Sequence, residues 1–442
     1  MSDKSIGFKD SGIECLGNIP RDWSSKKLKF AARVRFSGVD KKSEEGEQQI
    51  KLCNYVDVYY NDRITSAIDF MVATASSEEI EKFKLKQGDV LVTKDSEEWE
   101  DIAIPAYVAE SFEDVICGYH LAQIRPCEKL IDGRFLFWLL SSYRLNHQFK
   151  VEATGITRYG LSNYALSNGI ILLPSIDEQK FLAVYLDRKT MQIDELIAKK
   201  ERMIELLKEE RTAVINQAVT KGLDPKTEMK DSGIEWLGKI PKHWSLKDLK
   251  YVSRVNRLAL PETTAEDYEF NYIDISNVDL DDGFLLGEKI RFNDAPSRAR
   301  RNVQKGDTII STVRTYLKAV AYIEEDFQNL IVSTGFAVVT PRDIFVSKFL
   351  YYVVRSERFI DRVCSLSVGV SYPAINSTEL SDIAIWYPKD KEEQEKIVDY
   401  LDRAMRKIKT IIKRVQTEIA YLKEYRTALI SEVVTGKVDV RN

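Results

Sequence analysis

The chain repeats itself at an interval as long as a whole domain. Residues 9–24 return as residues 230–245, with the same Lys-Asp-Ser-Gly-Ile-Glu start, Leu-Gly pair, Ile-Pro pair and final Trp-Ser pair. An offset of about 221 residues exceeds the period of roughly 20 to 50 residues that marks solenoids and propellers. The sequence therefore predicts two large copies of one structural unit, and this duplication constrains every further assignment of the fold.

Weaker matches keep the two copies aligned further along the chain. A Gly-Asp turn before a β-branched segment occurs in residues 88–94 and again in 306–312, and residues 118–126 correspond loosely to 334–341. Between these anchors the copies differ in sequence and in loop length. Short β-branched segments mixed with helical stretches predict an α+β fold, with two globular domains of about 150 residues each.

A long helix is predicted after each globular part. Its start fits a capping box in both copies, with Ser175 and Glu178 in the first and Asp390 and Glu393 in the second. Each helix then continues for roughly 43 residues without Gly or Pro. Its apolar residues recur at alternating steps of three and four, in the same register in both copies: Leu186, Ile193, Ile197, Ile204, Leu207, Val214 and Ala218, then Leu401, Ile408, Ile412, Ile419, Leu422, Leu429 and Val433.

Such a regular seam predicts a coiled coil of the two helices against each other. The alternative is that each helix packs only on its own domain. The predicted boundaries place the first globular domain at residues 1–174, the first long helix at 175–221, the second globular domain at 222–388, and the second helix with a C-terminal tail at 389–442.

One arginine falls within the seam of each helix, in a Leu-Lys-Glu-x-Arg-Thr-Ala segment that occurs twice. These residues are Arg211 and Arg426. A buried arginine without a partner would be costly. We therefore predict that each either sets the register of the helices or contacts another subunit.

Composition excludes several classes of protein. Hydrophobic residues make up 44% of the chain and charged residues 30%, and no apolar run approaches the length of about 20 residues that spans a membrane. The N-terminus lacks the layout of a signal peptide, so we expect a cytoplasmic protein. Five scattered cysteines predict free thiols, with Cys15 as a packing residue because Trp236 is its repeat partner, and only three histidines are present to complete a zinc site.

Motifs for catalysis are weak or missing. Residues 233–239 have the spacing of a phosphate-binding loop, but Ile240 stands where a Mg²⁺-binding hydroxyl is needed and Asn18 replaces the lysine in the first copy. The motifs of an adenine methyltransferase are missing, and the isolated Glu-x-Lys at 228–230 falls short of a nuclease site. The sequence therefore predicts a non-catalytic chain without a bound metal or cofactor.

Two kinds of loop favour recognition instead. One follows each Gly-Asp strand, and the other is a glycine-led turn before each long helix. Arginine, lysine, tyrosine and hydroxyl side chains on loops can reach base edges and phosphates, although an ordinary solvated hairpin is an equally good interpretation of any single residue. The net charge of −4 argues mildly against a chain that binds nucleic acid alone. The candidate DNA contacts are Lys94, Thr157, Arg158 and Tyr159 in the first copy and Arg314, Tyr316, Lys318, Ser371 and Tyr372 in the second.

Taken in order, these features resemble the specificity subunit of Type I restriction-modification systems. The resemblance rests on the doubled Asp-Ser-Gly-Ile-Glu-x-Leu-Gly-x-Ile-Pro-x-x-Trp box, the two Gly-Asp strands, the two proline-led Glu-Gln helix starts and the doubled Leu-Lys-Glu-x-Arg-Thr-Ala-x-Ile segment. It covers nearly the whole chain, and the ordered set is far more specific than any one element.

The resemblance implies two target-recognition domains, each reading half of an asymmetric bipartite site in double-stranded DNA, separated by an antiparallel coiled coil. It implies assembly with two modification subunits, which carry S-adenosylmethionine and methylate adenine, and with restriction subunits, which use ATP and Mg²⁺. Shared partners would dock where the two copies agree, and our candidates for this role are Trp23, Trp244, Arg211 and Arg426.

Two functions from other classes are weighed against this one. A coiled-coil scaffold that joins two protein-binding domains would show no dependence on DNA. An enzyme acting alone would methylate DNA as the purified chain with S-adenosylmethionine.

Overall fold

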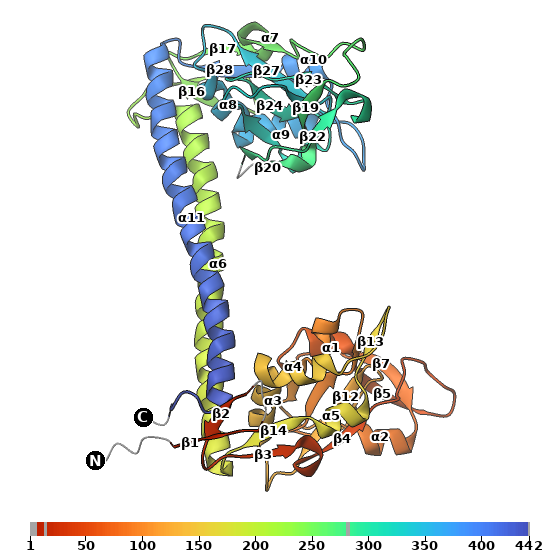
Figure 1. The fold of residues 1–442 in the computed structure, drawn as a ribbon. Helices are drawn as coiled ribbons and strands as arrows, with labels where there is room; N and C mark the ends of the chain where they lie inside the picture. Colours follow the sequence, from red (N-terminus) through yellow and green to blue (C-terminus); the bar gives the residue numbers. More distant parts are fainter. Residues whose placement is uncertain (1–6, 13–15, 280–282, 441–442) are drawn as a thin grey trace, which may run out of the picture. The chain divides into compact units, whose positions relative to one another are not determined.

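Two compact units make up the protein. The computed structural model describes residues 7–12, 16–279 and 283–440. Unit 1 comprises residues 1–201 and 417–442, and unit 2 comprises residues 202–416. Each unit therefore contains one globular part and one segment of each long helix, α6 (Ile176–Lys221) and α11 (Lys391–Val434), which have 46 and 44 residues (Figure 1).

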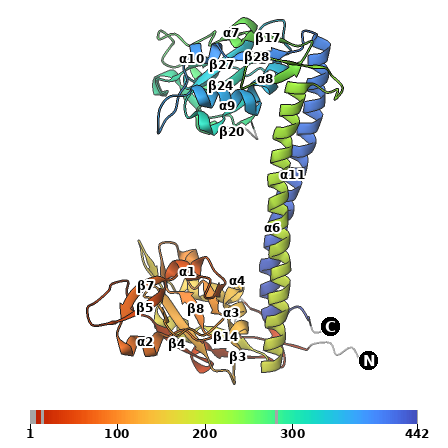
Figure 2. The ribbon, with the colours of Figure 1, turned by 180° about the vertical axis from the view of Figure 1, so that it is seen from behind.

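The globular part of unit 1 is built on two sheets. Their strand orders are β4-β12-β8-β10-β6 and β11-β5-β7, and all neighbours are antiparallel except β10 with β6 and β11 with β5. Helices α3 and α4 lie between these sheets and the long helices (Figures 1 and 2). The bounds are β4 (Ala32–Phe36), β5 (Gln48–Cys53), α1 (Tyr55–Tyr59), β6 (Arg63–Ile64), β7 (Met71–Ala75), α2 (Ser77–Phe83), β8 (Val90–Thr93), β10 (Pro105–Val108), β11 (Val115–Cys117), β12 (Leu121–Pro126), α3 (Gly133–Ser141), α4 (Tyr143–Val151) and α5 (Asn163–Asn168).

Unit 2 repeats this topology. The order β18-β27-β24-β25 matches the first four strands of the larger sheet in unit 1, and β26-β19-β22, with β26 parallel to β19, matches the smaller sheet. Strand β23 is an additional edge that pairs with β26. The bounds are α7 (Leu249–Val252), β18 (Ser253–Val255), β19 (Glu269–Ile273), β22 (Lys289–Arg291), β23 (Ala299–Asn302), β24 (Thr308–Ser311), β25 (Val320–Tyr322), β26 (Leu330–Ser333), β27 (Phe336–Pro341), α8 (Ser347–Arg355), α9 (Glu357–Leu366) and α10 (Ser377–Ser381). The predicted pseudo-symmetric α+β fold is confirmed.

The Gly-Asp turns begin equivalent buried strands. The Asp89 carboxylate accepts the backbone N–H of Lys86 at 3.0 Å, and Asp307 accepts that of Gln304 at 2.9 Å. Each aspartate thus closes the turn that leads into β8 or β24, whose residues are all buried. A repeated two-residue motif therefore positions the central strand of each unit.

The repeated boxes form β-hairpins. In the second copy the Asp231 carboxylate accepts the N–H of Gly233 at 2.8 Å, and Gly233 and Gly238 both have positive φ. A strand follows Gly238, so the phosphate-loop spacing belongs to a hairpin rather than to a turn that opens a helix. Residues 13–15, and with them the packing prediction for Cys15, lie outside the described residues. The strands are β1 (Phe8–Asp10) with β2 (Asn18–Pro20), and β15 (Met229–Asp231) with β16 (Lys239–Pro241).

The long-helix segments run antiparallel within each unit. In unit 1, Asp194 of α6 pairs with Arg426 of α11 at 2.9 Å, while Lys200 pairs with Glu418 at 2.5 Å. In unit 2, α6 residues near Val219 share one core with α11 residues near Leu401. Every predicted seam position is buried or half-buried, which confirms the coiled coil.

Candidate nucleic-acid interface

A hairpin and a strand-end loop meet in unit 1. Thr154 and Gly160 exchange backbone hydrogen bonds of 3.0 and 2.8 Å, which close the hairpin over residues 154–160. The N–H of Leu161 donates to the carbonyl of Lys94 at 2.7 Å, and β13 (Tyr159–Gly160) pairs with β9 (Asp95–Ser96). The hairpin therefore lies beside the loop that follows β8.

Unit 2 builds the same junction from different side chains. Val368 and Ala374 exchange hydrogen bonds of 2.9 and 3.0 Å, and the N–H of Ile375 donates to the carbonyl of Thr312 at 2.9 Å. In each unit the structure thus brings together the two loops that carry the predicted DNA contacts. Of those contacts, the exposed ones are Thr157, Arg158, Arg314, Tyr316, Ser371 and Tyr372, whereas Lys94, Tyr159 and Lys318 are half-buried.

Glycine is required at the start of both hairpin tips. Gly155 has φ of 146°, and a Cβ there would lie 1.9 Å from the carbonyl oxygen of Arg158. Gly369 has φ of 121°, and a Cβ would lie 3.1 Å from the carbonyl oxygen of Tyr372. A side chain at Gly155 would force the tip open, and one at Gly369 would be crowded and strained by the positive φ. The tight turn therefore explains the glycine in both copies.

In the unit 1 site, the Asp95 carboxylate contacts both His120 and Arg158. Asp95 Oδ1 lies 2.6 Å from His120 Nδ1 and 3.1 Å from Arg158 Nη2. The Asp95 side chain is 18% exposed, whereas that of Arg158 is 54% exposed. Asp95 therefore orients the guanidinium and leaves much of it accessible to a ligand.

Lys94 has a more internal position than predicted. Its Nζ donates to the carbonyl of Ser37 at 2.9 Å and lies 4.4 Å from the ring centroid of Tyr119. Burial lowers the pKa of Lys94. Lys94 thus stabilises the loop from within, rather than presenting its charge at the surface.

The unit 2 site combines a stacked arginine with backbone strain. The Arg314 guanidinium lies 4.8 Å from the Tyr372 ring centroid. Arg314 and Lys318 have φ of 51° and 53°, and they flank the one-turn 3₁₀ helix η5 (Thr315–Leu317) that exposes Tyr316. Left-handed conformations cost non-glycine residues of the order of 1–3 kcal/mol and cluster at functional sites.

Sequence reasoning missed several residues at these sites. His120 follows Gly118 in a segment that the repeat aligns only loosely, so its neighbourhood gave a weak signal. In unit 2, the carbonyl of Arg298 accepts the N–H of Thr334 at 2.7 Å, and its side chain is 58% exposed. Arg298 directly precedes β23, the strand that has no counterpart in unit 1, so the repeat gave no signal for it.

Trp23 and Trp244, predicted to dock partners, are buried within their own units. Their exposed fractions are 2% and 1%. The Trp244 indole N–H donates to Glu393 Oε1 at 2.9 Å, and a Cβ on Gly436, just beyond α11, would lie 3.2 Å from the Trp23 ring. Since neither ring has surface to offer, the structure corrects this prediction: both indoles pack the repeated box against a long helix.

The seam arginines have neighbours inside their own units. Arg426 Nη2 lies 3.1 Å from Asp62 Oδ2, and Arg426 Nε lies 2.9 Å from Asp194 Oδ1. Arg426 thus ties α11 both to α6 and to the globular part of unit 1. This arrangement supports the register-setting alternative for Arg426.

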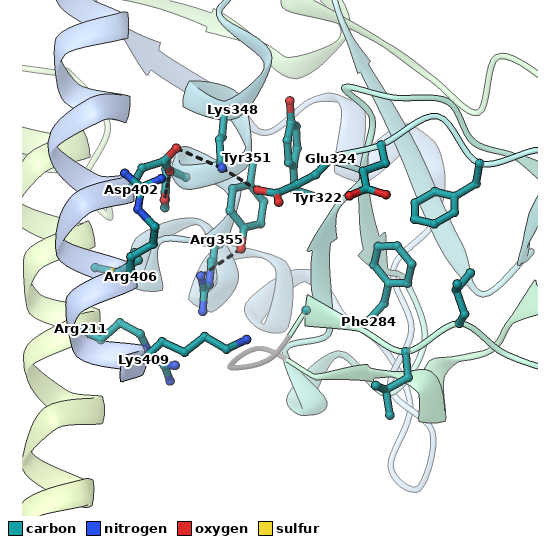
Figure 3. A pocket seen from close by; sticks show the side chains of 17 residues that line it. Arg211, Phe284, Tyr322, Glu324, Lys348, Tyr351, Arg355, Asp402, Arg406 and Lys409 are labelled. Atoms are coloured by element: carbon teal, nitrogen blue, oxygen red, sulfur yellow. Dashed lines mark hydrogen bonds and ion pairs between the residues drawn. The ribbon is translucent and has the colours of Figure 1, made fainter. Parts of the chain in front are cut away.

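Arg211 lines a cavity of about 700 Å³ in unit 2. Figure 3 shows Arg211, Arg406 and Lys409 extending from the two long helices toward it. Lys348 Nζ bridges Glu324 at 2.6 Å and Asp402 at 3.1 Å. Although burial lowers the pKa of Lys348, the two carboxylates outweigh it and raise the pKa.

The glutamine of the repeated Glu-Gln pair joins each long helix to its globular part. Gln394 Nε2 donates to the carbonyls of Ile344 at 3.2 Å and Pro388 at 2.9 Å, and its Oε1 accepts the N–H of Val346 at 2.8 Å. Gln179 makes the equivalent three bonds in unit 1. The sequence indicated only a helix start here, whereas the structure adds a buried connection.

The described residues contain free cysteines but no cluster of metal ligands. Among them no cluster of His, Cys, Asp and Glu could hold a metal ion, and no helix is long and apolar enough to cross a membrane. Cys53, Cys117, Cys127 and Cys364 are free thiols. Burial raises the pKa of Cys53 and Cys117, which makes both thiols poor nucleophiles.

Comparison with known proteins matches the two-copy architecture. The family model described as Type I restriction modification DNA specificity domain matches residues 20–206 and again residues 241–421. The two matches cover most of the chain, with one match in each copy.

Individual relatives and a solved structure agree with this match. The chain is 25% identical over 193 residues to the Type I restriction enzyme MjaIX specificity subunit of Methanocaldococcus jannaschii. This match covers 40% of this chain and 41% of that protein. It is 23% identical over 330 residues to the MjaVIII specificity subunit of the same organism, and this match covers 73% of this chain and 74% of that protein. A chain from a structural study of the assembly and conformational transition of the type I R-M system gives a TM-score of 0.71 at 16% identity and covers 95% of this chain and 99% of its own length. This last likeness supports the fold.

Proposed function

The chain belongs to the Type I restriction-modification DNA specificity family, and we propose that each of its two units reads one half of a bipartite site in double-stranded DNA. One observation carries this proposal. The hairpin and the strand-end loop form the same junction in both units, yet the side chains at the junction differ. One scaffold with two sets of reading groups is what an asymmetric site with two different halves requires.

The chemistry of each junction suits DNA. Arg158 in unit 1 is oriented by Asp95, and an oriented arginine can donate two hydrogen bonds to guanine in the major groove. Arg314 in unit 2 is stacked on Tyr372, and exposed hydroxyls at Thr157 and Ser371 can reach phosphates. The two units should therefore recognise different bases while holding the duplex in similar ways.

The proposed role is recognition of DNA, so catalysis in the complex would be carried out by partner subunits. Modification subunits would carry S-adenosylmethionine and methylate adenine, and restriction subunits would use ATP and Mg²⁺ to translocate and cleave DNA. Two modification subunits fit a chain with two equivalent units, since equivalent surfaces bind identical partners in equivalent ways. The complex would act in the cytoplasm, where the DNA of a prokaryotic cell lies.

Base-resolution mapping of adenine methylation tests the proposal. Cells that express the partner genes are compared with and without this gene, and one bipartite methylated motif should disappear when the gene is missing. With Arg158→Ala the motif should lose selectivity in one half only, and with Arg314→Ala in the other half only. Lys199→Ala, at an exposed position of α6, is the control and should leave the motif intact. If no motif disappears when the gene is missing, the proposal fails and the scaffold function is favoured. A motif that relaxes in both halves with one variant would also contradict the proposal.

A further inference from the structure

An aliphatic side chain projects from the tip of each hairpin. Ile156 in unit 1 is 96% exposed, and Val370 in unit 2 is 101% exposed relative to the reference state. These are the two highest values among the large apolar side chains of the described residues. They occupy the same place in the two copies, directly after Gly155 and Gly369.

Backbone hydrogen bonds close both hairpins and attach them to their units. The backbone pairs of Thr154 with Gly160 and of Val368 with Ala374 close the hairpins, and both are bonded to the loop after the central strand. The glycines adopt positive φ values that residues with a side chain rarely adopt. An aliphatic side chain that stays in water gives up the free energy that its burial would provide. Ile156 and Val370 could recover that free energy by contacting a ligand.

The surroundings favour nucleic acid over a protein partner. Residues 154–160 and 368–374 contain no carboxylate, and the residue after each aliphatic is a hydroxyl, Thr157 or Ser371. Arg158 lies within one hairpin, and Arg314 is stacked on the other. The hydroxyls can contact phosphates and the guanidinium groups can contact base edges, while the apolar tip reaches the base stack beside them.

A feature that both units share cannot distinguish two different half-sites. It must act on something that the half-sites have in common, and the base stack is common to every duplex. On the basis of the function proposed above, we propose that Ile156 and Val370 are apolar wedges that enter the base stack of the half-site read by their own unit and open one base step. Wedges of this kind unstack and kink DNA in other architectural proteins.

The wedge would assist methylation. A methyltransferase must extrude its target base from the stack, and the energy of unstacking is part of the cost. A step already opened by Ile156 or Val370 lowers that cost for the modification subunit. The side chains around the wedge read the sequence, and the wedge itself prepares the duplex.

The test uses the complete methyltransferase complex and duplexes with 2-aminopurine placed at successive steps of each half-site. Its fluorescence rises when neighbouring bases unstack. With Ile156→Ser the rise should disappear in the first half-site only, and methylation of that half should fall about tenfold or more while the recognised sequence stays the same. Val370→Ser should do the same in the second half-site. Ile156→Val should retain the rise, and Tyr164→Ser, which removes another exposed apolar side chain of unit 1, should change nothing.

Three outcomes would overturn the wedge. Unchanged fluorescence and methylation with Ile156→Ser and Val370→Ser would show that the tips do not enter the stack. A changed base preference would make the tips reading groups, and weaker retention of the modification subunit with normal DNA distortion would make them protein contacts. In each of these cases the wild-type complex still methylates one bipartite motif, so the proposed function stands. If the wild-type complex methylates no motif, the proposed function itself fails.

Discussion

Replacing Gln394 with leucine should separate α11 from the globular part of unit 2. Gln394 has no exposed surface and makes three hydrogen bonds to main-chain groups of Ile344, Val346 and Pro388. Leucine has a similar volume but no polar atoms, so two carbonyls and one N–H would lose these partners.

The magnitude follows from those three groups. A buried polar group left without a partner costs about 1–3 kcal/mol, and removing one partner leaves the other with the full penalty. A carbonyl oxygen can accept a second hydrogen bond, so the two carbonyls need not lose every partner. We therefore expect Gln394→Leu to lower the unfolding free energy of unit 2 by about 3–5 kcal/mol in total. For a unit of this size, with a urea m-value of about 2–3 kcal/mol per molar, the unfolding midpoint of unit 2 should fall by roughly 1–2 M.

Urea unfolding monitored by hydrogen–deuterium exchange measures this effect in one unit at a time. Peptides from α8 should exchange faster in Gln394→Leu, while those from α3 should not. Gln179→Leu should give the reverse pattern, because Gln179 makes the equivalent bonds in unit 1. Gln416→Leu, at an exposed position of α11, is the matched control. A loss of unfolding free energy below about 0.5 kcal/mol for Gln394→Leu, the usual range of surface substitutions, would refute the reasoning.

Three further predictions concern the unit 1 site. Asp95→Asn should weaken discrimination at one base pair of the first half-site by about 1–3 kcal/mol, because Arg158 loses its charged support, and methylation of duplexes substituted at each position measures this. Gly155→Ala should open the hairpin and abolish first-half selectivity while second-half selectivity survives, as scored by the same assay. Between the lowered pKa of Lys94 and its ordinary value of 10.5, the unfolded chain binds more protons than the folded chain, so stability should rise with pH across that window. Lys94→Met should remove this rise. Thermal unfolding from pH 8 upward measures how stability changes with pH, and an equal slope in the variant and the wild type would contradict the assignment.

The duplication and the long helices could be predicted because both are written in local patterns. A repeated box is visible wherever it folds, and an apolar seam at steps of three and four indicates a helix without knowledge of its partner. The Gly-Asp turns likewise depend on side-chain to backbone bonds a few residues apart. Each of these signals is local in sequence: the box is a contiguous motif, the seam is a pattern within one helix, and the aspartate of each turn bonds three residues away.

Other assignments depended on contacts that the sequence does not display. Trp23 and Trp244 looked like docking residues because both copies keep them, yet each packs against a helix far along the chain. Gln179 and Gln394 looked like part of a helix start, yet their side chains bond to loops more than 40 residues away. A repeated residue can mark a shared fold as well as a shared partner, and only its burial distinguishes the two.

By itself the sequence determined that this protein consists of two copies of an α+β domain with two paired long helices, and that it resembles a DNA specificity subunit. Only the tertiary structure decided which side chains make up each candidate site. Asp95, His120 and Arg158 come from three separate segments, and the pairing of β9 with β13 brings the first and the last together. Strand pairing joins residues across long stretches of chain, and this leaves no periodic or local trace in the sequence from which the site could have been assembled.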